Sequence, residues 1–226
     1  MESPAPAATH DYSAPMRLWH WVNALLVSGQ LLTILFLKVI VNARAALPDI
    51  KREVAERGAQ LTDAQGRAIA HVIGDRIWDW HIWIGLALAA SWLGWTVLQI
   101  LAPAGRRFGA RLVAAAGRYR LAPPAAHADA RHALGANLTY AIFYLAITVM
   151  VCTGLALTWA DDVAWLGAIE HTVKEVHNVM MYIIIGYILV HVGGVLWSEL
   201  TTAPGLTSRM ISGEGKAARP VGANER

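Results

Sequence analysis

The stretch EVHNVMMYIIIGYILVHVGGVLW, Glu175–Trp197, decides the fold of this chain. From Val176 to Glu199 the residues are mostly apolar, and the segment is long enough for a helix to cross a bilayer, which takes about 20 residues. Two histidines interrupt it, His177 near its start and His191 near its end. Ionisable side chains are rare within membrane spans and usually face the protein interior. The segment therefore predicts a membrane helix that carries two functional side chains.

The composition of the whole chain supports the same fold class. Of 226 residues, 56% are hydrophobic and only 15% are charged, and the mean hydropathy is +0.40. A soluble domain carries about 25% charged residues. The single cysteine, Cys152, excludes an intrachain disulfide and any CxxC motif for covalent haem, zinc or an iron–sulfur cluster. The sequence pI is about 9.2, but the basic residues lie between apolar segments, which indicates membrane topology rather than nucleic-acid binding.

We predict an all-α membrane protein, a bundle of four transmembrane helices. The spans are expected at about 18–41, 80–101, 134–159 and 176–199. They form one domain, 18–199, between an N-terminal segment, 1–17, and a tail, 200–226. The N-terminal segment lacks a basic stretch followed by a cleavage site, so we expect the first span to be retained. Lys38, near the end of that span, can extend its ammonium towards water.

Lysine and arginine residues predict the orientation. The loop between the second and third spans holds six arginines against one acid, Asp129, which is typical of a cytoplasmic loop. The connection after the third span is acidic, and the tail is basic. Both termini are therefore predicted to be cytoplasmic. The first loop, 42–76, has nearly balanced charges, and we expect one or two short surface helices there, outside the membrane.

Two further histidines lie at span edges, His20 at the start of the first span and His81 at the start of the second. Fourteen helical residues come within about 40° of four full turns and rise about 21 Å, so His177 and His191 lie on one helix face near opposite sides of the bilayer. The first span begins in the cytoplasm, which brings His20 to the depth of His191. The second span begins outside, which brings His81 to the depth of His177. The topology thus predicts two histidine pairs at different depths.

Each pair would hold an iron ion from two sides. Haem b is bound noncovalently, and ligation by two histidines leaves no open position, which suits electron transfer rather than oxygen chemistry. Zinc prefers tetrahedral sites, and the two pairs are too far apart to share one ion. A proton relay is an alternative, although no Asp or Glu lies deep in a span to continue it. Several glycines near the histidines would leave room for a macrocycle, or would serve helix packing alone: Gly29, Gly85, Gly186, Gly193 and Gly194.

The other histidines have weaker signals. We expect His10 and His127, in polar or Pro/Ala-rich segments, to be solvated, and we do not predict a ligand at His71 in the first loop. His171 precedes the fourth span and is an alternative to His177. His132, at the start of the third span, is an alternative to His20.

Three segments resemble one family of membrane proteins. They are SAPMRLWHWVNALL (13–26), DRIWDWHIWIGLAL (75–88) and the fourth span followed by GLTSRMISGEGK (205–216). They are similar to the membrane b-type cytochromes of the bacterial cytochrome b561 and nickel–iron hydrogenase group, and the similarity covers all four spans. There are two departures. HALGANLTY (132–140) stands where hydrogenase cytochromes often carry a GHNP-like motif at the third span, and the first loop, Asn42–Arg76, does not match the family pattern.

The resemblance implies a four-helix protein with two haems b, the inner held by His20 and His191 and the outer by His81 and His177. It also implies that Arg17, beside His20, meets a haem propionate; a plain positive-inside anchor is the alternative. Members of the group exchange electrons between membrane quinone and a redox partner. Here the partner stays open between a nickel–iron hydrogenase and a periplasmic c-type cytochrome.

We therefore expect a multi-pass protein in the lipid of the bacterial inner membrane that transfers electrons between a periplasmic-side redox partner and the quinone pool. It would be an electron-transfer subunit with no catalytic residue of its own. One alternative is a self-contained oxidoreductase, such as a superoxide:quinone oxidoreductase. Another is a haem-free transporter or assembly protein, which is disfavoured because no span is broken mid-membrane by proline or paired glycine.

Overall fold

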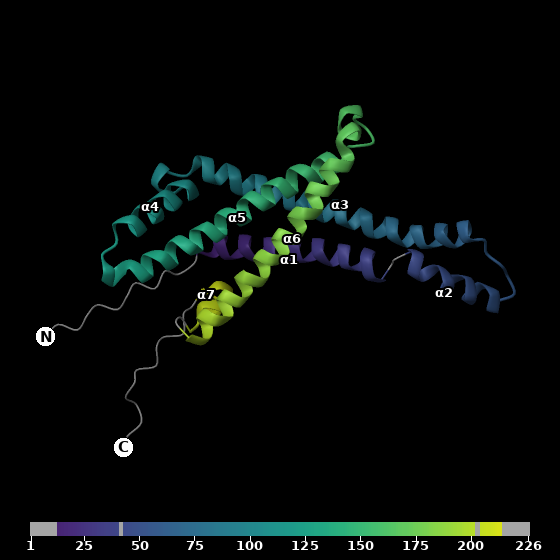
Figure 1. Cartoon of the computed structure of the whole chain (residues 1–226), viewed down its shortest axis with the longest axis horizontal. Coiled ribbons are helices and arrows are strands. Elements are labelled where there is room, and N and C mark those ends of the chain that lie inside the picture. The colour runs from purple at the N-terminus through teal and green to yellow at the C-terminus, as the bar shows by residue number, and fades with distance from the viewer. Residues whose placement is uncertain (1–12, 41–42, 202–203, 214–226) are drawn as a thin grey trace, which may run out of the picture. The chain divides into compact units, whose positions relative to one another are not determined.

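The computed structural model describes residues 13–40, 43–201 and 204–213, and every regular element in these ranges is a helix (Figure 1). Predictions that fall on 1–12, 41–42, 202–203 and 214–226 lie outside the described residues. They include most of the N-terminal segment with His10, and most of the tail.

Four helices are long and apolar enough to cross a membrane, which confirms the predicted all-α class with four spans. They are α1 (Ala14–Leu35), which continues into a π-helical turn (Phe36–Ile40), α3 (Asp63–Leu101), α5 (His127–Thr158) and α6 (Ala164–Thr201). Lys38 in the π-helical turn has its Nζ 5.9 Å from the ring centroid of Tyr182 on α6, a cation–π contact at the end of the first span.

The first loop holds one short separate helix, within the predicted one or two. Its first part forms the separate helix α2 (Ala43–Glu56), but its second part is not a separate helix, because α3 runs without a break from Asp63 to Leu101. No proline interrupts this stretch, and a glycine within a helix costs only about 1 kcal/mol. A helix of 39 residues is about 58 Å long, nearly twice the hydrocarbon thickness of about 30 Å. The first half of α3 is therefore expected outside the hydrocarbon.

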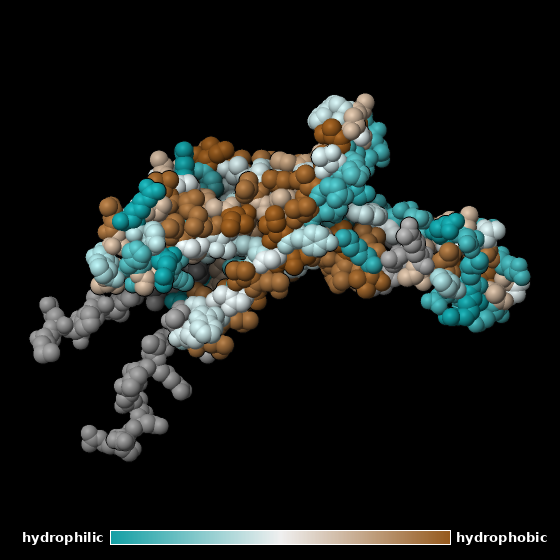
Figure 2. Space-filling model, in the orientation of Figure 1, coloured by the Kyte–Doolittle hydropathy of each residue, from teal (hydrophilic) through white to brown (hydrophobic). Residues whose placement is uncertain are grey.

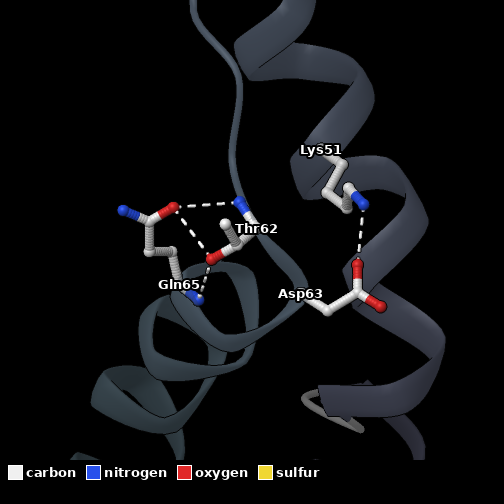
Figure 3. Close-up of polar contacts among 4 residues, drawn as sticks. All are labelled: Lys51, Thr62, Asp63 and Gln65. Carbon is white, nitrogen blue, oxygen red and sulfur yellow. Dashed lines mark hydrogen bonds and ion pairs between the residues drawn. The ribbon is translucent and has the colours of Figure 1, made fainter.

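The start of α3 is defined by a capping box (Figure 3). The backbone N–H of Gln65 donates to Thr62 Oγ1 over 3.3 Å, and the backbone N–H of Thr62 donates to Gln65 Oε1 over 2.9 Å. Lys51 of α2 lies 2.7 Å from the carboxylate of Asp63, the first residue of α3. These contacts satisfy N–H groups that a helix start leaves without intrahelical partners, and they hold α2 beside α3.

The helix α4 (Phe108–Leu121) was not predicted. It lies beside α5, in the segment expected to be a basic loop (Figure 1). Short 3₁₀ turns at Ala104–Arg106 and Pro124–Ala126 flank it. The tail forms a last short helix, α7 (Leu206–Ile211), after Gly205, whose φ of 88° is in the left-handed region.

The described chain divides into two compact units, one made of Asn23–Ile184 and the other of 13–22 with 185–201 and 204–213. In the first unit, hydrophobic residues gather over α3 and α5, whereas hydrophilic residues gather at α2 and the start of α3 (Figure 2). Large apolar side chains such as Leu98, 61% exposed, and Leu145, 67% exposed, point away from the protein. In a bilayer such side chains face lipid, which is as apolar as they are.

Candidate functional site

The unit Asn23–Ile184 brings His81 of α3 and His177 of α6 together. Their ring centroids are 6.5 Å apart, at an interplanar angle of 72°, and both side chains are half-buried. Because a metal–imidazole bond is about 2 Å long, two imidazole rings that hold one metal ion from opposite sides have centroids roughly 6 Å apart. The His81–His177 pair therefore has the separation that a single shared ion requires.

A cavity of about 280 Å³ adjoins this pair, and both histidines line it. Its walls are mainly apolar side chains of α1, α3, α5 and α6, among them Ile147 and Met181, and two charged residues, Glu170 and Lys174, also line it. This volume is close to the lower end of the range for small-molecule sites, and an apolar wall with few polar groups is typical of them.

A threonine hydroxyl contacts Nδ1 of each ring of this pair. Thr33 Oγ1 of α1 lies 2.8 Å from His81 Nδ1, and Thr153 Oγ1 of α5 lies 2.9 Å from His177 Nδ1. Gln30 of α1 adds a third contact, because its Nε2 donates to the backbone oxygen of His81 over 2.7 Å. These contacts do not use the second nitrogen, Nε2, of either ring, which stays available to bind a metal ion.

Two glycines leave room for side chains at this pair. A Cβ at Gly154 would lie 3.3 Å from His177 Cε1, and a Cβ at Gly85 would lie 2.9 Å from Gln30 Nε2. Both glycines line the cavity. Gly154 was not among the glycines singled out from the sequence. Of the others, Gly29 packs against Ile84 at ordinary distance, and a Cβ at any of the remaining three would meet open space: Gly186, Gly193 and Gly194.

The second unit brings His20 of α1 and His191 of α6 together. Their ring centroids are 6.2 Å apart, at an interplanar angle of 54°, and both side chains are half-buried. Tyr187 stacks on His191 with a centroid distance of 5.6 Å, and Trp21 meets His20 edge-on at 5.4 Å. This separation, too, is that of two rings on opposite sides of one ion.

Arg17, predicted to meet a propionate, is half-buried on α1 in this second unit. Its guanidinium lies where a side chain at Gly213 would be, and Gly213 has a φ of 82°. Glu199 near the end of α6 accepts the backbone N–H groups of Gly205 and Thr207 over 2.7 and 2.9 Å. The start of the tail is therefore held against the end of α6, in the same unit as Arg17.

The remaining described histidines have exposed side chains: His71, His127, His132 and His171. His127 contacts Tyr119, with ring centroids 4.7 Å apart. Within 13–40, 43–201 and 204–213, no group of three or more His, Cys, Asp or Glu residues comes together. Among these residues, each histidine pair is thus two imidazole rings without a third such side chain beside them.

Sequence reasoning missed four residues around the first pair: Gln30, Thr33, Thr153 and Gly154. Threonine and glycine are ordinary residues in an apolar helix, whereas Gln30 is a polar side chain within a span, a signal that could have singled it out. Their partners lie 23 to 51 positions away in the chain, which no helical spacing relates.

Comparison with known proteins gives the family. The family model described as prokaryotic cytochrome b561 matches residues 11–213, nearly the whole chain and all four long helices. No curated protein and no solved structure matches the chain. The match covers both histidine pairs and the cavity beside the first. This multi-pass membrane protein belongs to the prokaryotic cytochrome b561 family, the b-type cytochromes, whose membership implies haem b and electron transfer.

Proposed function

We propose that the chain binds two haems b and carries electrons between a redox protein on the periplasmic side of the bacterial inner membrane and the membrane quinone pool. The observation that supports it most is the distance between the two ring centroids within each histidine pair. It is 6.5 Å for His81–His177 and 6.2 Å for His20–His191. When bound, haem b supplies a one-electron carrier.

The chain's own residues bind the haem and shield it from water. The two imidazoles of each pair would hold the haem iron, and ligation by two histidines would leave no open position for oxygen. Apolar side chains around the first pair exclude water, and Lys174 at the cavity offers a cation to a carboxylate substituent. In the second unit we assign Arg17 the same role towards a propionate.

The orientation of the chain in the membrane is inferred from the charge pattern of the sequence. Basic residues of the second loop and the tail favour cytoplasmic termini, and this topology puts the His81–His177 pair near the periplasmic side. Electrons from a hydrogenase or a c-type cytochrome would enter at that pair and leave to quinone from the His20–His191 side. The chain acts as the electron-transfer subunit of such a complex.

The first experiment measures haem per chain and the dithionite-reduced minus oxidised spectrum of the purified protein. H81A and H177A are expected to lose one haem, and H20A and H191A the other. H132A and H171A, which change exposed histidines, serve as controls and should keep both. A wild-type chain without haem, or four histidine variants with unchanged content, would overturn the proposal.

The second experiment tests the electron path in liposomes. Quinol added to the bilayer should reduce both haems of the wild type, and an impermeable external oxidant should reoxidise them through the periplasmic side. Superoxide-dependent quinone reduction by the chain without a partner would instead identify a self-contained oxidoreductase.

A further inference from the structure

We propose that two threonine hydroxyls, from helices α1 and α5, position the rings of the His81–His177 pair and select the tautomer that presents Nε2 to the iron. Thr33 acts on His81, and Thr153 acts on His177. The inference deepens the proposed function and rests on haem ligation by this pair.

The hydrogen bonds of Thr33 determine which ring nitrogen of His81 carries the proton. Thr33 Oγ1 lies 2.7 Å from the backbone oxygen of Gln30 and 2.8 Å from His81 Nδ1. A carbonyl oxygen only accepts, and a hydroxyl has one hydrogen, so that hydrogen goes to Gln30. Nδ1 of His81 must then donate to Thr33. A neutral ring with its proton on Nδ1 has a free lone pair on Nε2, which is the metal-binding form.

The same assignment of the single hydroxyl hydrogen applies to Thr153, the partner of His177. Thr153 Oγ1 lies 2.7 Å from the backbone oxygen of Val149, 3.1 Å from that of Met150 and 2.9 Å from His177 Nδ1. Its hydrogen is used by the preceding helical turn, a bond that threonine commonly makes in membrane helices. Nδ1 of His177 therefore donates to Thr153. Both rings of the pair are set to the same tautomer by separate helices.

Burial protects the contact of Thr33 with His81 from water. Thr33 is only 7% exposed and is the one buried polar side chain within the described residues. Water cannot easily replace it as the partner of His81. Gln30 Nε2 holds the backbone of His81 from the same face of α1, so ring and backbone are both anchored by that helix.

The other pair lacks this support. Among the described residues, no hydrogen bond reaches a ring nitrogen of His20 or His191, whose rings contact Trp21 and Tyr187 instead. A ligand ring that donates its Nδ1–H to an oxygen is a more basic ligand, which favours the oxidised metal. The two threonines should therefore lower the midpoint potential of the haem at His81–His177 and leave the other haem unaffected.

The test compares T33V and T153V, which remove the hydroxyl at similar volume, with T33S and T153S, which keep it. T96V is the matched control, because Thr96 Oγ1 donates to a backbone oxygen, that of Trp92, and contacts no histidine. The readouts on the haem-loaded protein are a redox titration of each haem and the electron paramagnetic resonance signal of the oxidised low-spin iron.

The valine variants are expected to raise the midpoint potential of the haem that H81A and H177A lose, and to alter its resonance signal. Loss of one hydrogen-bond partner of a metal-binding histidine typically lowers the metal affinity 10- to 100-fold. A tenfold weaker preference for the oxidised iron corresponds to about 59 mV for a one-electron couple. The serine variants and T96V should stay at the wild-type value.

Valine variants with wild-type potential and signal would overturn the inference, as would serine variants that lose haem as fully as the valine variants do. Loss of haem by valine but not by serine would support it. Failure of the proposed function looks different, since H81A and H177A would then leave the haem content unchanged.

Discussion

Gly154 on α5 lies so close to the His177 ring on α6 that a methyl group on its Cα would come within 3.3 Å of Cε1, the ring atom beside Nε2. That distance is tighter than an ordinary van der Waals contact, so the ring would have to move. A glycine in the middle of an apolar helix costs about 1 kcal/mol relative to alanine. At this position the glycine leaves the space that the His177 ring occupies.

G154A is therefore expected to lower the haem content at the His81–His177 pair, by roughly tenfold in affinity, because the ring is displaced from its hydroxyl partner. The helix itself should become slightly more stable. The measurement is haem per chain and the difference spectrum. G135A is the control on the same helix, since a Cβ at Gly135 meets nothing within 4 Å. Equal haem content in the two variants would contradict the prediction.

Gly85 and Gln30 are expected to act as one unit. A Cβ at Gly85 would lie 2.9 Å from Gln30 Nε2, so G85A should push the amide away from the backbone oxygen of His81. Q30A removes the same bond, which is worth about 0.5–1.5 kcal/mol. Both variants should lower the temperature at which this haem is lost, and the double variant should be no worse than the larger single effect. Additive losses would show that the two residues act separately.

E199A should release the start of the tail from α6, because the carboxylate accepts two backbone N–H groups, those of Gly205 and Thr207. Trypsin cleavage after Arg209 is expected to become several-fold faster, with E199Q intermediate because its amide keeps one acceptor oxygen. T201A is the control, since Thr201 Oγ1 bonds only within α6, to the oxygen of Trp197. Unchanged cleavage in E199A would mean that other contacts hold the tail.

T62A removes the cap at the start of α3, and T62S keeps a hydroxyl there. Loss of such a cap costs about 1 kcal/mol. Hydrogen exchange of the first-turn amides of α3 should be roughly fivefold faster in T62A and near wild type in T62S. Haem content should be the same in both, because this end of α3 lies far along the helix from His81. A loss of haem in T62A alone would link the α2–α3 turn to the site.

Much of the site was predictable because it depends on periodicity. Apolar stretches of about 20 residues predict spans wherever they occur, and all four are helices in the structure. The spacing of His177 and His191, with the charge pattern of the loops, predicted which histidines would pair. In each predicted pair the two ring centroids lie close together, 6.2 Å apart for His20–His191 and 6.5 Å apart for His81–His177. Their role as haem ligands stays a prediction.

Other features depend on neighbours far apart in the chain. The merging of the second half of the first loop into α3 was missed, because an apolar-to-polar change in sequence does not end a helix when no proline or cap interrupts it. Thr33 and Thr153 carry no signal of their own, since threonine in a span ordinarily bonds to its own helix. Their contacts with histidines arise only once α1, α3, α5 and α6 are packed.

The sequence by itself determined that this is an all-helical membrane protein with four spans, and that histidines lie at their edges, because hydropathy and helical spacing are local properties. Only the tertiary structure decided what surrounds those histidines: which hydroxyl contacts each ring, which glycine leaves room for a ring, and which helix anchors the backbone of His81. The physical reason is that a hydrogen bond or a close contact depends on atoms of two helices meeting within about 3 Å, and no one-helix pattern encodes that meeting.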